Sequence, residues 1–172
     1  MHATKATLSG AGLSCPKVTG AGTGSFDFEA EAGEWDEFQC GSYAFMDADY
    51  ARNFLKDGSS FTTFEQSLFV LATVMSRPED SLAIVYAGLK AIAVDSGYAV
   101  PHDLPGIEYV GASDEHGKLS VGPDFPPFVL GDKIRLIPGH CDPTVNLHDW
   151  YVCVRGGIVE DIWPIAARGT VF

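Results

Sequence analysis

The run DKIRLIPGHCDPTVNLHDWYVCVRGGIVEDIWPIAARG, residues 132–169, carries the clearest fold signal in the chain. Residues 133–137 predict one strand. Residues 145–154 and 158–165 predict two more, joined at Arg155-Gly156-Gly157, where consecutive glycines suit a tight hairpin turn. The end of the chain is therefore expected to be β-structure.

The sequence before this run continues the same pattern back to about residue 61. Apolar and β-branched stretches separated by Gly, Pro, Asp and Ser predict short strands at close spacing, which is typical of a barrel-like or sandwich β-domain. Helices should be few and short. The predicted strands are residues 67–76, 82–87, 90–95 and 108–112, with turns at 77–80 and 114–117 and loops at 96–105 and 122–127.

The first sixty residues differ in composition from the rest. They predict the last turns of a helix, stopped by Gly10 and Gly12, and then several short strands before a polar stretch at 56–60, where we place a domain boundary. The expected elements are a helix at 2–9, strands at 15–19, 26–31 and 37–46, and a turn or short helix at 47–53.

Composition narrows the classes of partner. The 172 residues are 46% hydrophobic, enough for a sizeable core, and the formal net charge of −12 disfavours nucleic-acid binding. The longest apolar run, residues 68–75, is too short to span a bilayer, and no secretory signal opens the chain. Four scattered cysteines do not form a disulfide framework or a zinc motif. We therefore expect a cytoplasmic protein with free thiols, a small-molecule substrate, and no nucleic-acid or membrane partner.

A short metal-ligand pattern, His140-x-Asp142, lies between the predicted strands. If this segment is extended, residues two apart point to one face, so the imidazole and the carboxylate share a target. A nitrogen and a hard oxygen suit Mn²⁺ or Mg²⁺, and Zn²⁺ is also compatible. The alternative is two ordinary loop residues before a strand. His148, on the same strand parity, is more simply a hydrogen-bonded structural histidine than a third ligand.

A glycine-rich turn, Gly20-Ala-Gly-Thr-Gly24, follows the predicted strand at 15–19. Such a turn can present backbone N–H groups to a phosphate. Its GxGxG spacing is neither the dinucleotide nor the P-loop fingerprint, so a simple tight turn is the alternative.

Three stretches together resemble one enzyme family. Residues 131–169, VTGAGTGSF at 18–26 and QCGSYAFMDADY at 39–50 resemble the D-threonine aldolases. That family includes 3-hydroxy-D-aspartate aldolases and is related to D-serine dehydratases. The resemblance implies the alanine-racemase fold type, a barrel that binds pyridoxal 5'-phosphate (PLP) followed by a β-domain. The expected fold is mainly β (α+β): residues 1–58 are the last strands of a truncated (β/α) barrel, and 59–172 are the β-barrel-like domain.

The resemblance also assigns residues. It makes His140 and Asp142 the metal ligands, and Thr23, Gly41 and Ser42 the groups that bind the PLP phosphate. Three further residues are weaker phosphate candidates. In the dehydratases a cysteine replaces the aspartate and the metal is zinc, so an aspartate at 142 favours Mn or Mg over Zn. The weaker candidates are Gly22, Gly24 and Tyr43.

The implied activity is a PLP- and metal-dependent lyase that cleaves D-β-hydroxy-amino acids to glycine and an aldehyde, acting as a homodimer. Two alternatives stay open: a D-serine dehydratase-type ammonia-lyase, or a catalytically inactive metal-binding β-domain. No lysine here matches the context of the family's Schiff-base lysine, so we assign no catalytic residue. We expect the chain to be the C-terminal half of a longer enzyme.

Overall fold

The computed structural model describes residues 2–169, which divide into two compact units. The first contains residues 2–44 and Tyr50–Glu65, and the second contains Phe45–Asp49 and residues 66–169. The short segment Phe45–Asp49 thus belongs with the C-terminal β-structure. The predicted domain division between residues 58 and 59 stays a prediction about the intact protein.

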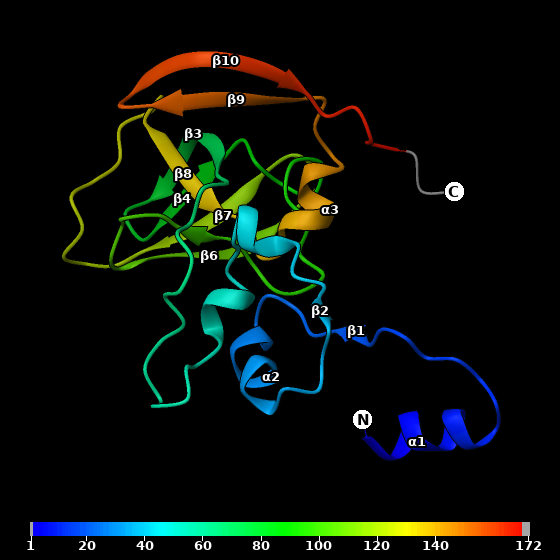
Figure 1. Cartoon of the computed structure of the whole chain (residues 1–172). Helices are drawn as coiled ribbons and strands as arrows, with labels where there is room; N and C mark the ends of the chain where they lie inside the picture. Colours follow the sequence, from blue (N-terminus) through cyan, green and yellow to red (C-terminus); the bar gives the residue numbers. More distant parts are fainter. Residues whose placement is uncertain (1, 170–172) are drawn as a thin grey trace. The chain divides into compact units, whose positions relative to one another are not determined.

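The first unit is built from short helices and two short strands (Figure 1). Strands β1 and β2 pair in parallel, with Thr19 opposite Glu37. Each strand is followed by one of the two segments predicted to bind phosphate. The elements are α1 His2–Gly10, β1 Thr19–Gly20, α2 Phe26–Ala32, β2 Glu37–Phe38 and 3₁₀ turns at Ser42–Ala44 and Tyr50–Arg52.

None of the three strand predictions in this unit was correct as made. Residues 15–19 are extended only at Thr19, where β1 begins. Residues 26–31 form helix α2, because Asp27 and Glu29 in its first turn favour the helix N-terminus and Gly33, at φ 64°, ends it in the left-handed conformation. Residues 37–46 are extended only at Glu37–Phe38, because the Gly41 carbonyl accepts the Ala44 N–H and starts a turn. The predicted helix before Gly10 is confirmed as α1.

The second unit contains a six-stranded, fully antiparallel sheet in the order β5-β8-β3-β4-β7-β6 (Figure 1). The two edge strands, β5 and β6, also pack against each other, so the sheet curls into a nearly closed barrel. This confirms the prediction of a mainly β, barrel-like fold. The strands are β3 Val70–Glu79, β4 Leu82–Val85, β5 Val100–Pro101, β6 Ile107–Ala112, β7 Gly117–Val121 and β8 Lys133–Ile137.

The core fills the inside of this barrel. Alternate residues of β7 and β8 point inward, as period-two burial requires. The most deeply buried apolar side chains include Val85, Ile92, Leu119, Ile134 and Leu136, each 2% exposed or less.

Several strand boundaries in this unit differ from prediction. Strand β3 continues to Glu79, so the turn predicted at 77–80 begins only at Asp80, and the pairing with β4 shifts register between Ser76 and Glu79, around Pro78. Residues 90–95 form a turn instead of a strand, because the Gly88 carbonyl accepts the N–H groups of Ala91 and Ile92. Strands β5 and β7 lie in sequence not predicted to be extended, whereas β8 matches its prediction.

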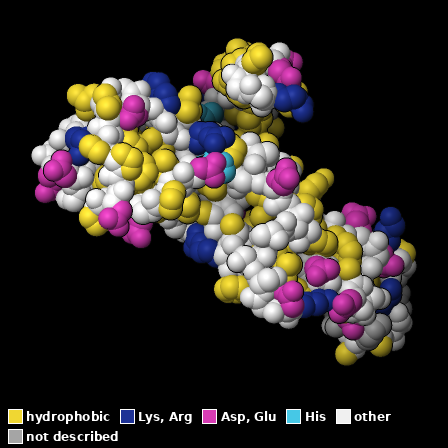
Figure 2. Space-filling model, turned by 90° about the vertical axis from the view of Figure 1, so that its left-hand side faces the viewer, with side chains coloured by type: hydrophobic (Ala, Val, Ile, Leu, Met, Phe, Trp, Pro, Cys, Tyr) yellow, Lys and Arg dark blue, Asp and Glu magenta, His cyan; other side chains and the backbone are white. Residues whose placement is uncertain are grey.

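Strands β9, Trp150–Arg155, and β10, Ile158–Pro164, form a separate antiparallel hairpin. Gly156 and Gly157 have φ of 57° and 79°, as a two-residue type I′ turn demands, so the predicted turn is confirmed. Trp150, Val152 and Ile162 are all more than half exposed. Hydrophobic side chains are visible among charged ones on the face shown in Figure 2. Among the described residues, no helix has the length and apolar character needed to cross a membrane.

We expect the stability of the barrel to fall at high pH because of Tyr109. Burial raises the pKa of its phenol to about 12, with a smaller contribution from Tyr98, and its hydroxyl donates to the Ala87 carbonyl at 2.8 Å. Because the folded pKa exceeds the unfolded value of about 10, this contribution to stability is complete below pH 10 and is lost as pH rises towards 12. Urea titrations at pH 9 and 11 should show stability falling less steeply for Tyr109→Phe than for the parent chain.

The Tyr109→Phe variant should also lose about 1 kcal/mol at pH 9 through the missing hydrogen bond. The exposed Tyr86 supplies the control, since Tyr86→Phe should reproduce the parent curve at both pH values. Equal pH dependence of parent and Tyr109→Phe would contradict the assignment.

Candidate metal centre and phosphate site

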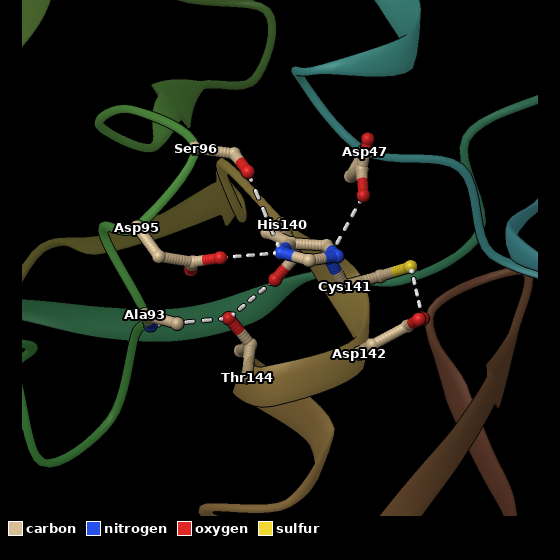
Figure 3. Close-up of polar contacts among 8 residues, drawn as sticks. All are labelled: Asp47, Ala93, Asp95, Ser96, His140, Cys141, Asp142 and Thr144. Carbon is tan, nitrogen blue, oxygen red and sulfur yellow. Dashed lines mark hydrogen bonds and ion pairs between the residues drawn. The ribbon is translucent and has the colours of Figure 1, made fainter. Parts of the chain in front are cut away.

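His140 and Asp142 lie at the start of a short helix, α3, Cys141–Val145. His140 is the extended residue that precedes the helix, at φ −142° and ψ 122°, and Asp142 is in its first turn. The expectation of an extended His-x-Asp segment was therefore wrong, and the two side chains do not share a strand face. Their relation is set by the turn from strand into helix (Figure 3).

The imidazole of His140 lies among carboxylates. Its Nδ1 is 2.6 Å from Asp95 Oδ2 and 3.5 Å from Ser96 Oγ. Burial by itself lowers the pKa of His140, but the hydrogen bond to Asp95 and the negative charges of Asp95, Asp142 and Asp47 outweigh it and raise that pKa. The same hydrogen bond lowers the pKa of Asp95. This concentration of negative charge attracts a cation.

The carboxylate of Asp142 is oriented by its neighbour. The Cys141 thiol, fully buried, lies 3.2 Å from Asp142 Oδ1 and donates to it. Among residues 2–169, no group of three or more His, Cys, Asp and Glu side chains is arranged to hold a metal. A cation bound through His140 and Asp142 would therefore take its remaining ligands from water, substrate or cofactor. A nitrogen and a carboxylate with open positions fit that role.

The loop at 91–97 supports this segment from one side. The Ala93 N–H donates to Thr144 Oγ1 at 3.1 Å, and Thr144 in turn donates to the His140 carbonyl at 2.8 Å. Every second residue of the loop thus reaches the segment 139–148. The contacts pair Ala91 O with His148 Nε2, Ala93 with Thr144, Asp95 with His140, and Gly97 with Gly139. The 2.8 Å contact between His148 Nε2 and the Ala91 carbonyl is the kind of hydrogen bond expected of a structural histidine.

Gly139 is required by this packing. A Cβ at residue 139 would stand 2.0 Å from the Gly97 carbonyl oxygen, a backbone atom that cannot rotate away. We expect Gly139→Ala to destabilise the protein by at least about 3 kcal/mol, the upper part of the range for overpacking. Urea unfolding followed by circular dichroism measures this change.

Gly10 provides the matched control. It lies in helix α1, and a Cβ at residue 10 would meet no atom within 4 Å, so Gly10→Ala should be neutral or slightly stabilising. A Gly139→Ala variant as stable as the parent would contradict this expectation, because it would show that the backbone of the loop at 91–97 can shift at little cost in free energy.

The segment Phe45–Asp49 also holds the backbone that carries His140 and Asp142. Asp47, with no exposed surface, accepts the Cys141 N–H on Oδ2 at 2.8 Å, between the two candidate ligands in sequence. The N–H groups of Ala48 and Asp49 donate to the carbonyls of Pro138 and Gly139. Met46, buried at φ 56°, holds a left-handed conformation that non-glycine residues seldom adopt. The fold thus fixes the backbone of the candidate centre on two sides.

The sequence did not reveal Asp47 or Asp95 as part of the centre. Asp95 is 45 residues from His140, and Asp47 is 94 residues from Cys141. No spacing rule joins positions so far apart, and residues 90–95 were predicted to be a strand. Acidic residues in a loop carry no signal that would have distinguished them.

The predicted phosphate residues lie at the carboxyl ends of the parallel strands β1 and β2. The Gln39 N–H donates to the Gly20 carbonyl, and the Tyr43 N–H donates to Thr23 Oγ1 at 3.1 Å. The two predicted segments are therefore neighbours within the first unit, and Thr23 and Ser42 are buried. Phosphates commonly bind at such strand ends in (β/α) barrels.

Glycines in this region divide into two kinds. A Cβ at Gly22 or Gly41 would meet no protein atom within 4 Å, so both backbones border open space. A Cβ at Gly24 would stand 2.4 Å from Asn53 Nδ2, so packing alone explains Gly24. Ala21, at φ 59°, adopts the left-handed conformation typical of anion-binding turns.

The chain is similar to a family model, to curated enzymes and to solved structures. The family model described as a putative serine dehydratase domain matches residues 67–154. The 3-hydroxy-D-aspartate aldolase of Paracoccus denitrificans is 49% identical over 162 residues, which cover 93% of this chain and 41% of that protein. The crystal structure of D-threonine aldolase from Filomicrobium marinum superposes with a TM-score of 0.87 at 51% identity.

The superposition on that structure covers 98% of this chain and 45% of the Filomicrobium chain. An alanine racemase-like protein from Idiomarina loihiensis shares the fold, with a TM-score of 0.71 at 22% identity over 87% of this chain and 43% of that one. The chain thus spans less than half the length of each of these proteins.

Proposed function

The chain belongs to the family of the putative serine dehydratase domain, and we propose that it forms the C-terminal part of a PLP- and metal-dependent lyase. Its similarity to the D-threonine and 3-hydroxy-D-aspartate aldolases supports this proposal. The overall reaction would convert a D-β-hydroxy-amino acid into glycine and an aldehyde. The single observation that carries the proposal is the His140 and Asp142 pair at the turn into α3, surrounded by the carboxylates of Asp95 and Asp47.

His140 and Asp142 would hold the metal, and Thr23, Gly41 and Ser42 would hold the PLP phosphate. When bound, PLP would supply an electron sink for the bond that breaks, and the metal would lower the pKa of the substrate's β-hydroxyl. The residues of this chain would bind the metal and the PLP phosphate and fix their orientation. Asp142 offers a hard oxygen kept in place by the Cys141 thiol, and the buried Thr23 offers a hydroxyl beside open backbone at Gly22.

A chimeric enzyme tests the proposal. The C-terminal part of the Filomicrobium marinum D-threonine aldolase would be replaced by this chain over the superposed region. With PLP and Mn²⁺, the chimera should release glycine and acetaldehyde from D-threonine. The variant His140→Ala should lose that activity by about 10²-fold or more, the size of loss expected when a catalytic electrostatic contribution of about 3 kcal/mol is removed.

The alternatives give different products. A dehydratase would form pyruvate and ammonia from D-serine without glycine from D-threonine, and an inactive metal-binding domain would give neither. The chain by itself should turn over neither substrate, since none of its lysines matches the family's PLP-bound lysine. Borohydride treatment with PLP should accordingly leave no specific pyridoxyl-lysine.

A further inference from the structure

We propose that Asp95 is a positioning residue that holds the Nδ1 proton of His140, so that Nε2 is the nitrogen offered to a cation. This inference deepens the proposed metal role of His140 and rests on it. It concerns which of the two ring nitrogens binds, and which residue outside the ligand pair decides.

The contact itself fixes the direction of the hydrogen bond. Asp95 Oδ2 lies 2.6 Å from His140 Nδ1, and an ionised carboxylate can only accept a hydrogen bond. Nδ1 must therefore carry the proton, and in the neutral ring the lone pair is left on Nε2. Ser96 Oγ, 3.5 Å from the same nitrogen, is a further polar group on that side of the ring. Figure 3 shows both residues approaching the same edge of the imidazole.

The backbone that carries Asp95 is held independently of this contact. The Ala93 N–H is fixed to Thr144 Oγ1, and the Gly97 N–H donates to the Val94 carbonyl at 3.2 Å. Gly97 also abuts Gly139, the residue just before His140. The loop at 91–97 is therefore fixed by contacts other than the one between the Asp95 carboxylate and the His140 imidazole. Metal-binding histidines usually donate their second ring N–H to such a carboxylate, which fixes the tautomer.

The other two described histidines with polar contacts show the opposite arrangement. His148 uses Nε2 towards the Ala91 carbonyl, and His102 uses Nε2 towards Asp103 at 3.0 Å. His102 and Asp103 form a second carboxylate–imidazole pair, away from α3 in sequence and shared with Arg135. This pair is a matched control, because it has the same two side chains joined through the other nitrogen.

Nuclear magnetic resonance tests the tautomer without any metal. The 172-residue chain, labelled with ¹⁵N at histidine, would be recorded in long-range ¹H–¹⁵N spectra at a pH where the imidazoles are neutral, and His140 assigned by its loss in His140→Gln. The Nδ1–H form is expected for His140. A His140 ring protonated on Nε2 would overturn the inference, whatever the metal affinity turns out to be.

Metal binding tests the consequence. By titration calorimetry with MnCl₂, Asp95→Ala should bind Mn²⁺ roughly 10- to 100-fold more weakly than the parent, the usual effect of losing such a partner. Asp95→Asn keeps an oxygen that can accept the hydrogen bond from His140 Nδ1, so its Mn²⁺ affinity should lie close to that of the parent chain. If only the negative charge of Asp95 mattered, Asp95→Asn would bind Mn²⁺ as weakly as Asp95→Ala. Asp103→Ala should leave both affinity and tautomer unchanged.

The metal role of His140 and the positioning role of Asp95 are distinguished by these measurements. If the parent chain shows the Nδ1–H form but does not bind Mn²⁺, the metal role is wrong while the positioning of the ring by Asp95 stands. If it binds Mn²⁺ and Asp95→Ala binds equally well, Asp95 does not position the ligand. Chemical shifts of core residues such as Leu119 in each variant verify that the barrel is intact.

Discussion

Replacing Asp142 with cysteine is expected to change the metal preference of the centre from Mn²⁺ towards Zn²⁺. A carboxylate is a hard donor that suits Mn²⁺ and Mg²⁺, whereas a thiolate is a soft donor that selects Zn²⁺. The substitution also removes Oδ1, which the Cys141 thiol now contacts at 3.2 Å. We expect the ratio of Zn²⁺ to Mn²⁺ affinities to rise by at least about 100-fold, or about 2.8 kcal/mol at 1.4 kcal/mol per factor of ten.

Competition titrations of parent and Asp142→Cys with the two metals measure this ratio. Asp124→Cys is the control, because Asp124 is an exposed carboxylate outside the candidate centre and its replacement adds the same thiol. An unchanged preference in Asp142→Cys would show that residue 142 does not bind the metal. A shift in Asp124→Cys of equal size would attribute the effect to any added cysteine.

Replacing Leu136 with alanine is expected to destabilise the protein by about 2–5 kcal/mol. Leu136 has no exposed surface, and it is paired with Val70 on β3 and Pro101 on β5 in the middle of the barrel. Alanine would leave a cavity that strands on both sides cannot close. Since whole domains are stable by only about 5–15 kcal/mol, this loss is large.

Urea unfolding followed by circular dichroism should show a lower midpoint for Leu136→Ala with an unchanged slope. The control is Leu71→Ala on the adjacent strand β3, where the side chain is 67% exposed and the change should stay within about 0.5 kcal/mol. Equal effects at the two leucines would mean that β3 and β8 do not bury the face described above. A changed slope would point instead to loss of two-state unfolding.

The parts of the fold that could be predicted depend on local signals. The Gly156-Gly157 turn needs positive φ at both positions, and only glycine supplies it readily, so the hairpin turn was correctly located. The strand before it begins at Trp150, not at residue 145 as predicted, because α3 ends at Val145 and a turn follows. Strand β8 was correctly bounded for a similar local reason, because Gly131 and Pro138 flank it. Helix α2 was missed because alternating apolar and acidic residues were interpreted as a strand, while its helix-favouring first turn and terminal Gly33 were given less weight.

The candidate metal centre, too, could be predicted only where a local sequence pattern marks it. His140 and Asp142 were found from spacing and family resemblance, yet the geometry assumed for them was wrong, since Pro143 follows within the first turn of a helix, where proline is tolerated. Asp47 and Asp95 were beyond reach of any local pattern. They reach His140 and Cys141 only because the barrel closes and brings distant loops together.

The hairpin determines what optical spectroscopy can report. Two of the three tryptophans, Trp150 and Trp163, lie on β9 and β10 with more than half of their surface in water, and Trp35 is partly exposed in the first unit. The emission of the folded chain should therefore be red-shifted and readily quenched by acrylamide, and it should change little on unfolding. A blue shift of that emission would instead signal that another surface has covered the indoles of the hairpin.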